Sequence, residues 1–219
     1  MSPDLPHAPA TFEHDRRSSA LAAVKIMISG GFGVGKTTLI GAASEIEPLT
    51  TEEYLTEVSN SVDSLAGVEH KTTTTVALDF GRLTFPRQQM MLYLFGTPGQ
   101  DRFWFTWDDL VLGAVGAVVL LDTRRLTDAF TAVGYFEQAQ MPFIVAINEF
   151  DDAPYRYTTA EVRAALEVPD QVPVVRCDAR DRRSAITVLL TLVDHALTHQ
   201  RRQPRAPIPP ETRVHGAPA

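Results

Sequence analysis

The sequence contains a single cysteine, Cys177, among its 219 residues. One cysteine excludes a framework of internal disulfide bonds and agrees with a reducing compartment. We interpret Cys177 as a small buried hydrophobe, because no histidine and asparagine arrangement supports a catalytic thiol. The chain also lacks an excess of basic residues. Its formal net charge of −7 argues against general binding to nucleic acid.

Long hydrophobic runs are missing too. The longest, residues 111–121, is about half the length that a helix needs to span a bilayer. Residue 2 is a serine, whereas myristoylation requires glycine, and the chain ends in alanine without a prenylation motif. We therefore expect a cytoplasmic protein without direct membrane insertion, which reaches a membrane only through its partners.

The composition indicates one domain with two tails. Apolar residues make up 44% of the chain, enough for a hydrophobic core. Residues 1–20 contain prolines and a charged patch but no signal-peptide core, so we predict a disordered leader. Residues 200–219 are rich in proline and arginine and are predicted to form a tail. Residues 21–199 remain for a single globular domain.

The most informative stretch is GGFGVGKTT at residues 30–38, which fits the phosphate-loop pattern G-x-x-x-x-G-K-[ST]. An apolar, β-branched run at 22–28 precedes it and a stretch of helical composition follows at 38–45, as the pattern requires. A glycine-rich turn with a chance lysine is the alternative. The residues expected to contact phosphates are Gly30, Gly31, Gly33, Val34, Gly35, Lys36, Thr37 and Thr38.

The chemistry explains why these residue types occur together. Glycines allow successive backbone N–H groups to turn inward and form an anion site at the start of a helix. Lys36 is expected to reach the β- and γ-phosphates and to stabilise their charge, and the Thr37 hydroxyl is expected to ligate Mg2+.

The remaining pattern alternates strands with helices. Strands are predicted at 76–83, 88–95, 114–121, 143–147 and 172–176, and helices at 108–112, 127–138, 159–166 and 183–198. With the strand at 22–28, this predicts an α/β fold: a three-layer P-loop NTPase sandwich with a mostly parallel, six-stranded sheet and helices on both faces. Residues 47–69 are polar and are predicted to form a long functional loop.

Two motifs at strand ends suggest a base site. In NEFD at 148–151, the Asp151 carboxylate can accept two N–H bonds from guanine, which adenine does not offer, while Asn148 braces the surrounding loops. In CDAR at 177–180, the backbone N–H of Ala179 can donate to the guanine O6. The alternative for N-x-x-D is a polar turn that caps the next element.

Two further segments could respond to the γ-phosphate. Thr75 can offer its hydroxyl to Mg2+, although a threonine-rich run also simply favours a strand. The Gly99 N–H can donate to the γ-phosphate, so that this loop orders with the triphosphate. Gln100 is the candidate for orienting the attacking water.

Together, these features resemble the Ras-like small GTPases across residues 24–197. The order of phosphate loop, switch threonine, P-G-Q, N-x-x-D and D-A-R is similar to that family's five guanine-nucleotide motifs. TVALDF at 75–80 resembles the T-I-G-V-D-F of the Rab branch. This resemblance indicates that Thr75, and not one of the neighbouring threonines, is the switch threonine.

A narrower resemblance is to the actinobacterial conservon GTPases, relatives of the MglA-type polarity GTPases. It rests on three stretches: LFGTPGQ at 94–100, RFWF at 102–105 and VVLLDTRR at 118–125. This resemblance implies GTP or GDP with Mg2+ as ligands. It also implies two protein partners, a roadblock-domain protein and a membrane histidine-kinase-like sensor.

The chain departs from the family pattern at two positions. Gly96 stands where D-x-x-G would supply a carboxylate to the water shell of Mg2+, and Glu149 replaces the lysine of N-K-x-D. The change at Gly96 affects the expected metal affinity and hydrolysis rate, and Glu149 predicts weaker nucleotide binding than in Ras-like proteins.

An aromatic segment at 103–107 follows the P-G-Q loop and is expected either to join the core or to form an effector surface. Arg102, Arg124 and Arg125 are candidates for stabilising transition-state charge, but surface salt bridges are the favoured interpretation.

The sequence thus predicts a slow GTPase switch in which Lys36 and Gln100 are catalytic, Thr37 and Thr75 hold the metal, and Asn148, Asp151 and Ala179 recognise guanine. The alternatives are a nucleotide-binding scaffold without turnover, favoured by Gly96 and Glu149, and a small-molecule kinase or ATPase with the same loop.

Overall fold

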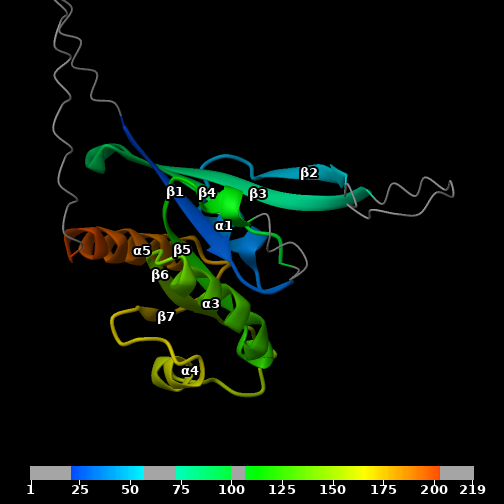
Figure 1. Ribbon diagram of the computed structural model, residues 1–219, viewed down its shortest axis with the longest axis vertical. Helices are drawn as coiled ribbons and strands as arrows, with labels where there is room; N and C mark the ends of the chain where they lie inside the picture. Colours follow the sequence, from blue (N-terminus) through cyan, green and yellow to red (C-terminus); the bar gives the residue numbers. More distant parts are fainter. Residues whose placement is uncertain (1–20, 57–72, 100–106, 203–219) are drawn as a thin grey trace, which may run out of the picture.

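The computed structural model describes residues 21–56, 73–99 and 107–202 (Figure 1). The predicted leader and most of the predicted tail lie outside these ranges. Helix α5 continues to Arg202, into the residues that were predicted to form the tail.

Within the described residues, seven strands form one sheet in the order β2-β3-β4-β1-β5-β6-β7. The strands are β1 (Ala22–Ser29), β2 (Leu49–Thr56), β3 (Thr73–Phe85), β4 (Met90–Gly96), β5 (Ala114–Leu121), β6 (Phe143–Asn148) and β7 (Val174–Cys177). Strand β1 pairs in parallel with β4 and β5, and the parallel pairing continues through β6 to β7. Only β2 and β3 run antiparallel to their neighbours.

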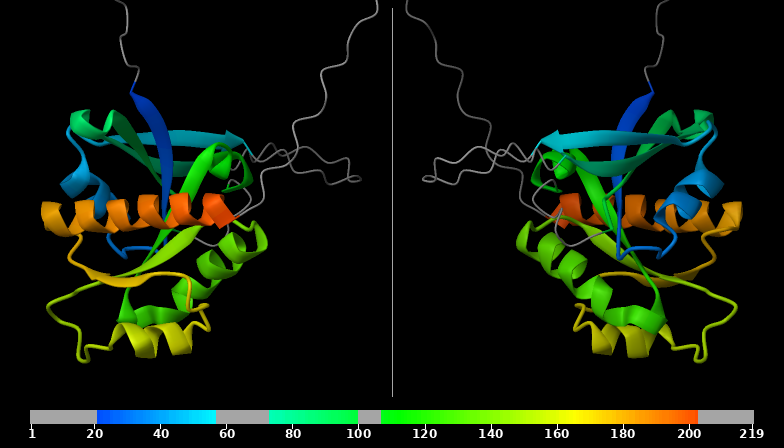
Figure 2. Two further views of the ribbon diagram at one scale, coloured as in Figure 1. Left: turned by 90° about the vertical axis from the view of Figure 1, so that its left-hand side faces the viewer. Right: turned by 90° about the vertical axis from the view of Figure 1, so that its right-hand side faces the viewer.

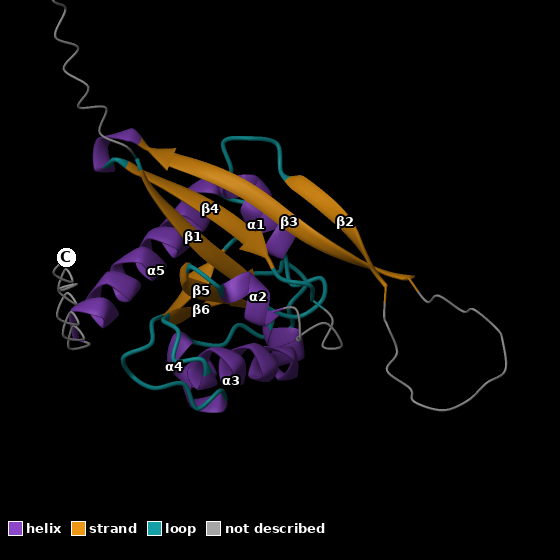
Figure 3. Ribbon diagram, turned by 45° about the horizontal axis from the view of Figure 1, so that its top comes forward, coloured by secondary structure: helices purple, strands orange, loops and turns teal. Residues whose placement is uncertain are grey.

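The α/β class and the mostly parallel sheet are confirmed, but the sheet has one strand more than expected. Strand β2 lies within the polar stretch that was predicted to be a loop. In the part of the chain that the structure describes, β2 lies at the edge of the sheet and pairs with β3 alone, a position where a polar sequence such as LTTEEYLT is tolerated. The β2–β3 ribbon extends to one side of the molecule (Figure 3).

Helices cover both faces of the sheet, as predicted. They are α1 (Lys36–Ala43), α2 (Trp107–Val111), α3 (Phe130–Gln138), α4 (Thr159–Ala165) and α5 (Arg182–Arg202), together with the 3-10 helices η1 (Pro86–Gln88) and η3 (Thr123–Ala129). Helix α4 begins at a capping box, because the Thr158 hydroxyl accepts from the Glu161 N–H and the Glu161 carboxylate accepts from the Thr158 N–H.

Alternate residues of the central strands supply two separate cores. Ile26 and Ile28 of β1 pack with α1 and α5 on one face, whereas Met27 packs with α3 on the other. The separation is visible in Figure 2, where the long orange helix α5 lies apart from the green helix α3 and the yellow helix α4. No helix in the described ranges combines the length and apolarity needed to cross a bilayer.

We predict that Phe136→Ala lowers the free energy of unfolding by about 3–5 kcal/mol, because the vacated volume would leave a cavity. Phe136 is completely buried in α3 and its ring lies 5.8 Å from that of Trp107 and 6.3 Å from that of Phe143. Phe130 of the same helix is 47% exposed, so Phe130→Ala is the control and should cost less than about 1 kcal/mol. Urea unfolding measures both, and equal losses would contradict this packing.

Candidate functional site

The predicted site residues come together at one edge of the sheet. Strands β1, β5, β6 and β7 are parallel, so their carboxyl ends lie on the same side. The loops that leave these ends carry residues 30–35, 122, 149–151 and 178–180. An open parallel sheet binds its ligands at this edge.

The phosphate loop joins β1 to α1 as the motif requires. Gly35 has φ +102°, which favours glycine, and a methyl group built on it would lie 2.8 Å from Nδ2 of Asn148. The position therefore needs glycine both for its backbone conformation and for the close approach of a neighbouring side chain.

Lys36 points into this loop. Its side chain is 8% exposed, and Nζ donates to the backbone carbonyls of Gly30 and Gly31, each at 2.8 Å. Burial lowers the pKa of Lys36 to about 8, and the nearby Asp79 carboxylate partly opposes that effect. Binding a polyphosphate would replace these carbonyl contacts with stronger, charge-assisted ones.

The loop after β4 lies against the phosphate loop. A methyl group built on Gly99 would lie 2.5 Å from Lys36 Nζ and 2.9 Å from the Cα of Phe32. Gly99 is thus beside the group that is expected to contact the γ-phosphate. Gln100, the candidate for positioning water, lies outside the described residues.

Asn148 links the phosphate loop to the loop after β7. Its Nδ2 donates to the Val34 carbonyl at 2.9 Å, and its Oδ1 accepts from the Ala179 N–H at 2.9 Å. The side chain is 7% exposed. In this arrangement the Ala179 N–H is engaged by Asn148, so donation to a base would require this contact to rearrange.

A cavity of about 380 Å3 joins the two halves of the site. The phosphate loop and the start of α1 line one part of it, and the loops after β6 and β7 line the other. Its lining includes Gly33, Gly35, Thr38, Asn148, Asp151 and Arg180. The space is sufficient for a ligand of small-molecule size.

Asp151, the predicted base-recognising residue, is paired with Arg180 in this structure. The Nη1 atom of Arg180 lies 2.8 Å from the Asp151 carboxylate, and Arg180 also bonds to Asp178. Hydrogen bonding and charge from Arg180 lower the pKa of Asp151 below its usual value. The carboxylate is 80% exposed, so an incoming base can compete for it.

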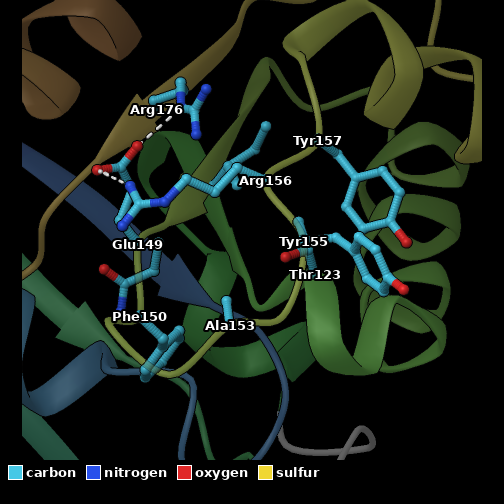
Figure 4. Close-up of a pocket in the computed structure, with 10 residues that line it drawn as sticks. Thr123, Glu149, Phe150, Ala153, Tyr155, Arg156, Tyr157 and Arg176 are labelled. Carbon is cyan, nitrogen blue, oxygen red and sulfur yellow. Dashed lines mark hydrogen bonds and ion pairs between the residues drawn. The ribbon is translucent and has the colours of Figure 1, made fainter.

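Two arginines neutralise Glu149, the residue that replaces the expected lysine. The Glu149 carboxylate lies 2.8 Å from Nε of Arg176 and 3.5 Å from Nη1 of Arg156. Figure 4 shows both arginines directed at this carboxylate. The negative charge of Glu149 is therefore offset locally.

Sequence reasoning missed one site residue, Asp79 of β3. Its Oδ2 atom accepts a hydrogen bond from the Thr37 hydroxyl at 2.5 Å. Aspartate is unusual in strands, so a carboxylate in the otherwise apolar VALDF segment was the available signal.

Thr75 also lies in β3, where its backbone pairs with Tyr54. The Thr75 side chain is outside the described part of the chain.

The arginines after β5 have different roles. Arg124 forms ion pairs with the buried Asp122 and with Asp152, and it stacks on the ring of Phe150 at 4.0 Å. The salt-bridge interpretation is thus confirmed for Arg124. Arg125 donates from Nη2 to the Phe32 carbonyl of the phosphate loop at 2.6 Å. Arg102 lies outside the described residues.

Two side chains prove to be structural. Cys177 is 3% exposed, and burial raises the pKa of its thiol to about 12, which confirms the buried-hydrophobe interpretation. Trp107 is 6% exposed and its ring lies 5.1 Å from that of Tyr135. This aromatic residue belongs to the core, while residues 103–106 lie outside the described ranges.

We predict that nucleotide-free protein becomes more stable as the pH rises from about 8 to 10.5. Across this interval the unfolded chain keeps a proton on Lys36 that the folded protein has released, so the free energy of unfolding increases with pH. Lys36→Met should remove this component. Urea unfolding at several pH values measures it, and parallel pH profiles for the two proteins would contradict the prediction.

Arg125 is predicted to orient the phosphate loop. The described peptide bonds are all trans, so the Phe32 carbonyl and the Gly33 N–H point in opposite directions. By holding that carbonyl, Arg125 fixes the direction of the N–H. We expect Arg125→Ala to weaken nucleotide binding about fivefold, the equivalent of one net hydrogen bond of about 1 kcal/mol. The control is Arg87→Ala in η1, and equal affinities for the two variants would refute this role.

Comparison with known proteins is consistent with this geometry. The family of conserved hypothetical ATP binding proteins matches residues 28–199. Uncharacterized protein MJ1339 from Methanocaldococcus jannaschii is 31% identical over 130 residues, which cover 58% of this chain and 71% of that protein.

A similar solved structure is the cytosolic domain of the T. maritima FeoB iron transporter in apo form, with a TM-score of 0.56 and 18% identity. The match covers 80% of this chain but only 64% of that one, and at this identity it shows the fold alone. The fold is that of a nucleotide-binding P-loop NTPase. Because the family match spans most of the chain, this protein belongs to the family of conserved hypothetical ATP binding proteins.

Proposed function

We propose that this protein is a GTP-binding switch that hydrolyses GTP slowly to GDP and phosphate. Its conformation would depend on whether the γ-phosphate is present, and protein partners would detect the difference. The finer resemblance to the conservon GTPases stays a prediction. The roadblock-domain protein and the membrane histidine-kinase-like sensor are proposed as partners on that resemblance alone.

The observation that carries the proposal is the position of Asn148. Its amide joins the Val34 carbonyl to the Ala179 N–H and so holds the phosphate loop beside the loops after β6 and β7. One cavity therefore has phosphate-binding groups and the Asp151 carboxylate in its lining. A carboxylate there can accept two N–H bonds from guanine, and adenine offers no equivalent pair.

The residues of the phosphate loop would supply most of the catalytic stabilisation. The backbone N–H groups and Lys36 would stabilise negative charge on the phosphates, and Gln100 would orient the attacking water. The packing of Gly99 against Lys36 supports a loop that must adjust when a γ-phosphate enters. This adjustment would convert nucleotide state into a change of surface.

The residues present also fit a magnesium ion. The Thr37 hydroxyl and the Asp79 carboxylate are oxygen donors of the kind that Mg2+ prefers, and they already touch. Within the described residues no group of three or more acidic, histidine or cysteine side chains is placed to hold a metal ion, so the phosphates would have to complete the site. Thr37 and Thr75 are proposed to hold the metal, which would neutralise phosphate charge when bound.

ATP is the rival nucleotide, because the family description names ATP binding. Asp151 is paired with Arg180 in this structure. If the carboxylate stayed paired when nucleotide is bound, it would not select guanine, and ATP could bind equally well. A scaffold that binds nucleotide without turnover is the other alternative. Single-turnover assays with GTP and ATP, each with and without Mg2+, separate these three cases.

We predict that Asp151→Asn weakens GTP binding at least about tenfold, because two charge-assisted bonds are lost. The same variant should gain affinity for xanthosine triphosphate, whose base has an oxygen where guanine has an amino group. The matched control is Asp170→Asn, which changes an exposed carboxylate between α4 and β7 that does not line this cavity and should leave GTP binding unchanged. Competition binding with a fluorescent GTP analogue measures all three proteins.

An unchanged preference between GTP and ATP in Asp151→Asn would contradict guanine recognition. Lys36→Ala provides the second test, since it should abolish hydrolysis by removing the charge that stabilises the phosphates.

A further inference from the structure

Two positions on neighbouring strands face each other beside the phosphate loop. Asp79 of β3 is the register partner of Gly96 of β4. The family resemblance places a metal-site carboxylate at position 96, and this chain has glycine there. The carboxylate nearest to that position therefore belongs to the adjacent strand.

Asp79 is directed at a residue expected to bind the metal. Its Oδ2 atom lies 2.5 Å from the Thr37 hydroxyl oxygen, which is the donor in this bond. A hydroxyl that gives its hydrogen to a carboxylate keeps its lone pairs available for a cation. Second partners of this kind orient metal ligands and raise their basicity.

Asp79 and a side chain at position 96 would compete for the same space. A methyl group built on Gly96 would lie 3.1 Å from the Asp79 Cβ and 3.3 Å from its Oδ2 atom. The Cδ1 atom of Ile40, in α1, would be 3.1 Å away on the other side. These distances are tight, so a side chain at position 96 would require Asp79 or Ile40 to shift by a few tenths of an ångström.

We propose that Asp79 is the carboxylate of the magnesium site and replaces the one that is missing at Gly96. The inference rests on the proposed nucleotide-binding function. Asp79 orients the Thr37 hydroxyl and supplies the negative charge that holds the water shell of the metal. Mg2+ sites that include substrate phosphates commonly need one or two carboxylates from the protein.

The local charges agree with this role. Lys36 and Asp79 interact electrostatically, so the carboxylate balances the buried ammonium when no ligand is bound. A magnesium-bound polyphosphate would give each of them a new partner of opposite charge. Asp79 thus serves the same site in both states.

The experiment measures release of a fluorescent GDP analogue as a function of Mg2+ concentration, with EDTA as the metal-free reference. This readout reports metal binding and does not require hydrolysis. The variants are Asp79→Asn, which keeps the shape and removes the charge, and Asp79→Ala combined with Gly96→Asp, which moves the carboxylate to the facing strand. Asp170→Asn, on the exposed loop between α4 and β7, is the charge-matched control.

The expected result for Asp79→Asn is an increase of about 10- to 100-fold in the Mg2+ concentration that half-slows GDP release. The half-slowing Mg2+ concentration of each variant is measured relative to its own release rate in EDTA, so that a change in metal-free nucleotide affinity does not count as a change in metal binding. The double variant should recover most of the Mg2+ dependence, because loss of the Asp79 carboxylate removes its 3.3 Å contact with position 96, and the remaining contacts with the residue 79 Cβ and the flexible end of Ile40 need to relax by only a few tenths of an ångström. Asp170→Asn should behave like the unmodified protein.

Unchanged Mg2+ dependence in Asp79→Asn would overturn the assignment, and so would an equal loss in the control. Asp79→Ala alone tests whether the double variant recovers metal binding through the new carboxylate: the single variant must remain impaired. Failure of the unmodified protein to bind guanine nucleotide under any condition would instead contradict the proposed function. The two failures are therefore distinguishable.

Discussion

The amide of Asn148 is the interaction on which the geometry of the site depends. It is buried at the end of β6, and it bonds to the phosphate loop on one side and to the loop after β7 on the other. Parallel strands bring these loops to one edge, but strand pairing alone does not set the distance between them. A buried amide with partners at both ends sets this distance, because leaving either partner unpaired would be costly.

Electrostatic compensation recurs around this framework. Glu149 stands in place of a lysine, and Arg176 and Arg156 offset its charge. Asp151 is paired with Arg180, and Asp79 lies where it can act for the carboxylate missing at Gly96. Changes that look unfavourable in the sequence are thus matched by partners that are distant in the chain and adjacent in the fold.

The sequence predicted local features and the fold class well. The phosphate loop and the buried parallel strands carry short-range signals, and each has the expected structure. Strand β2 was missed because an edge strand needs no apolar face. The Asp79 contact was missed because it depends on the register between β3 and β4, which no local pattern specifies. The partners of Glu149 and Asp151 depend in the same way on contacts between loops.

Equilibrium competition between GTP and ATP tests most directly whether this site selects guanine nucleotides. Labelled GTP is bound to the unmodified protein in the presence of Mg2+, and unlabelled GTP or ATP is then added in increasing concentration. ATP should displace the label only at concentrations at least about a hundredfold higher than GTP, because the Asp151 carboxylate can accept two N–H bonds from guanine and adenine offers no equivalent pair. Equal displacement by both nucleotides, or stronger displacement by ATP, would contradict it.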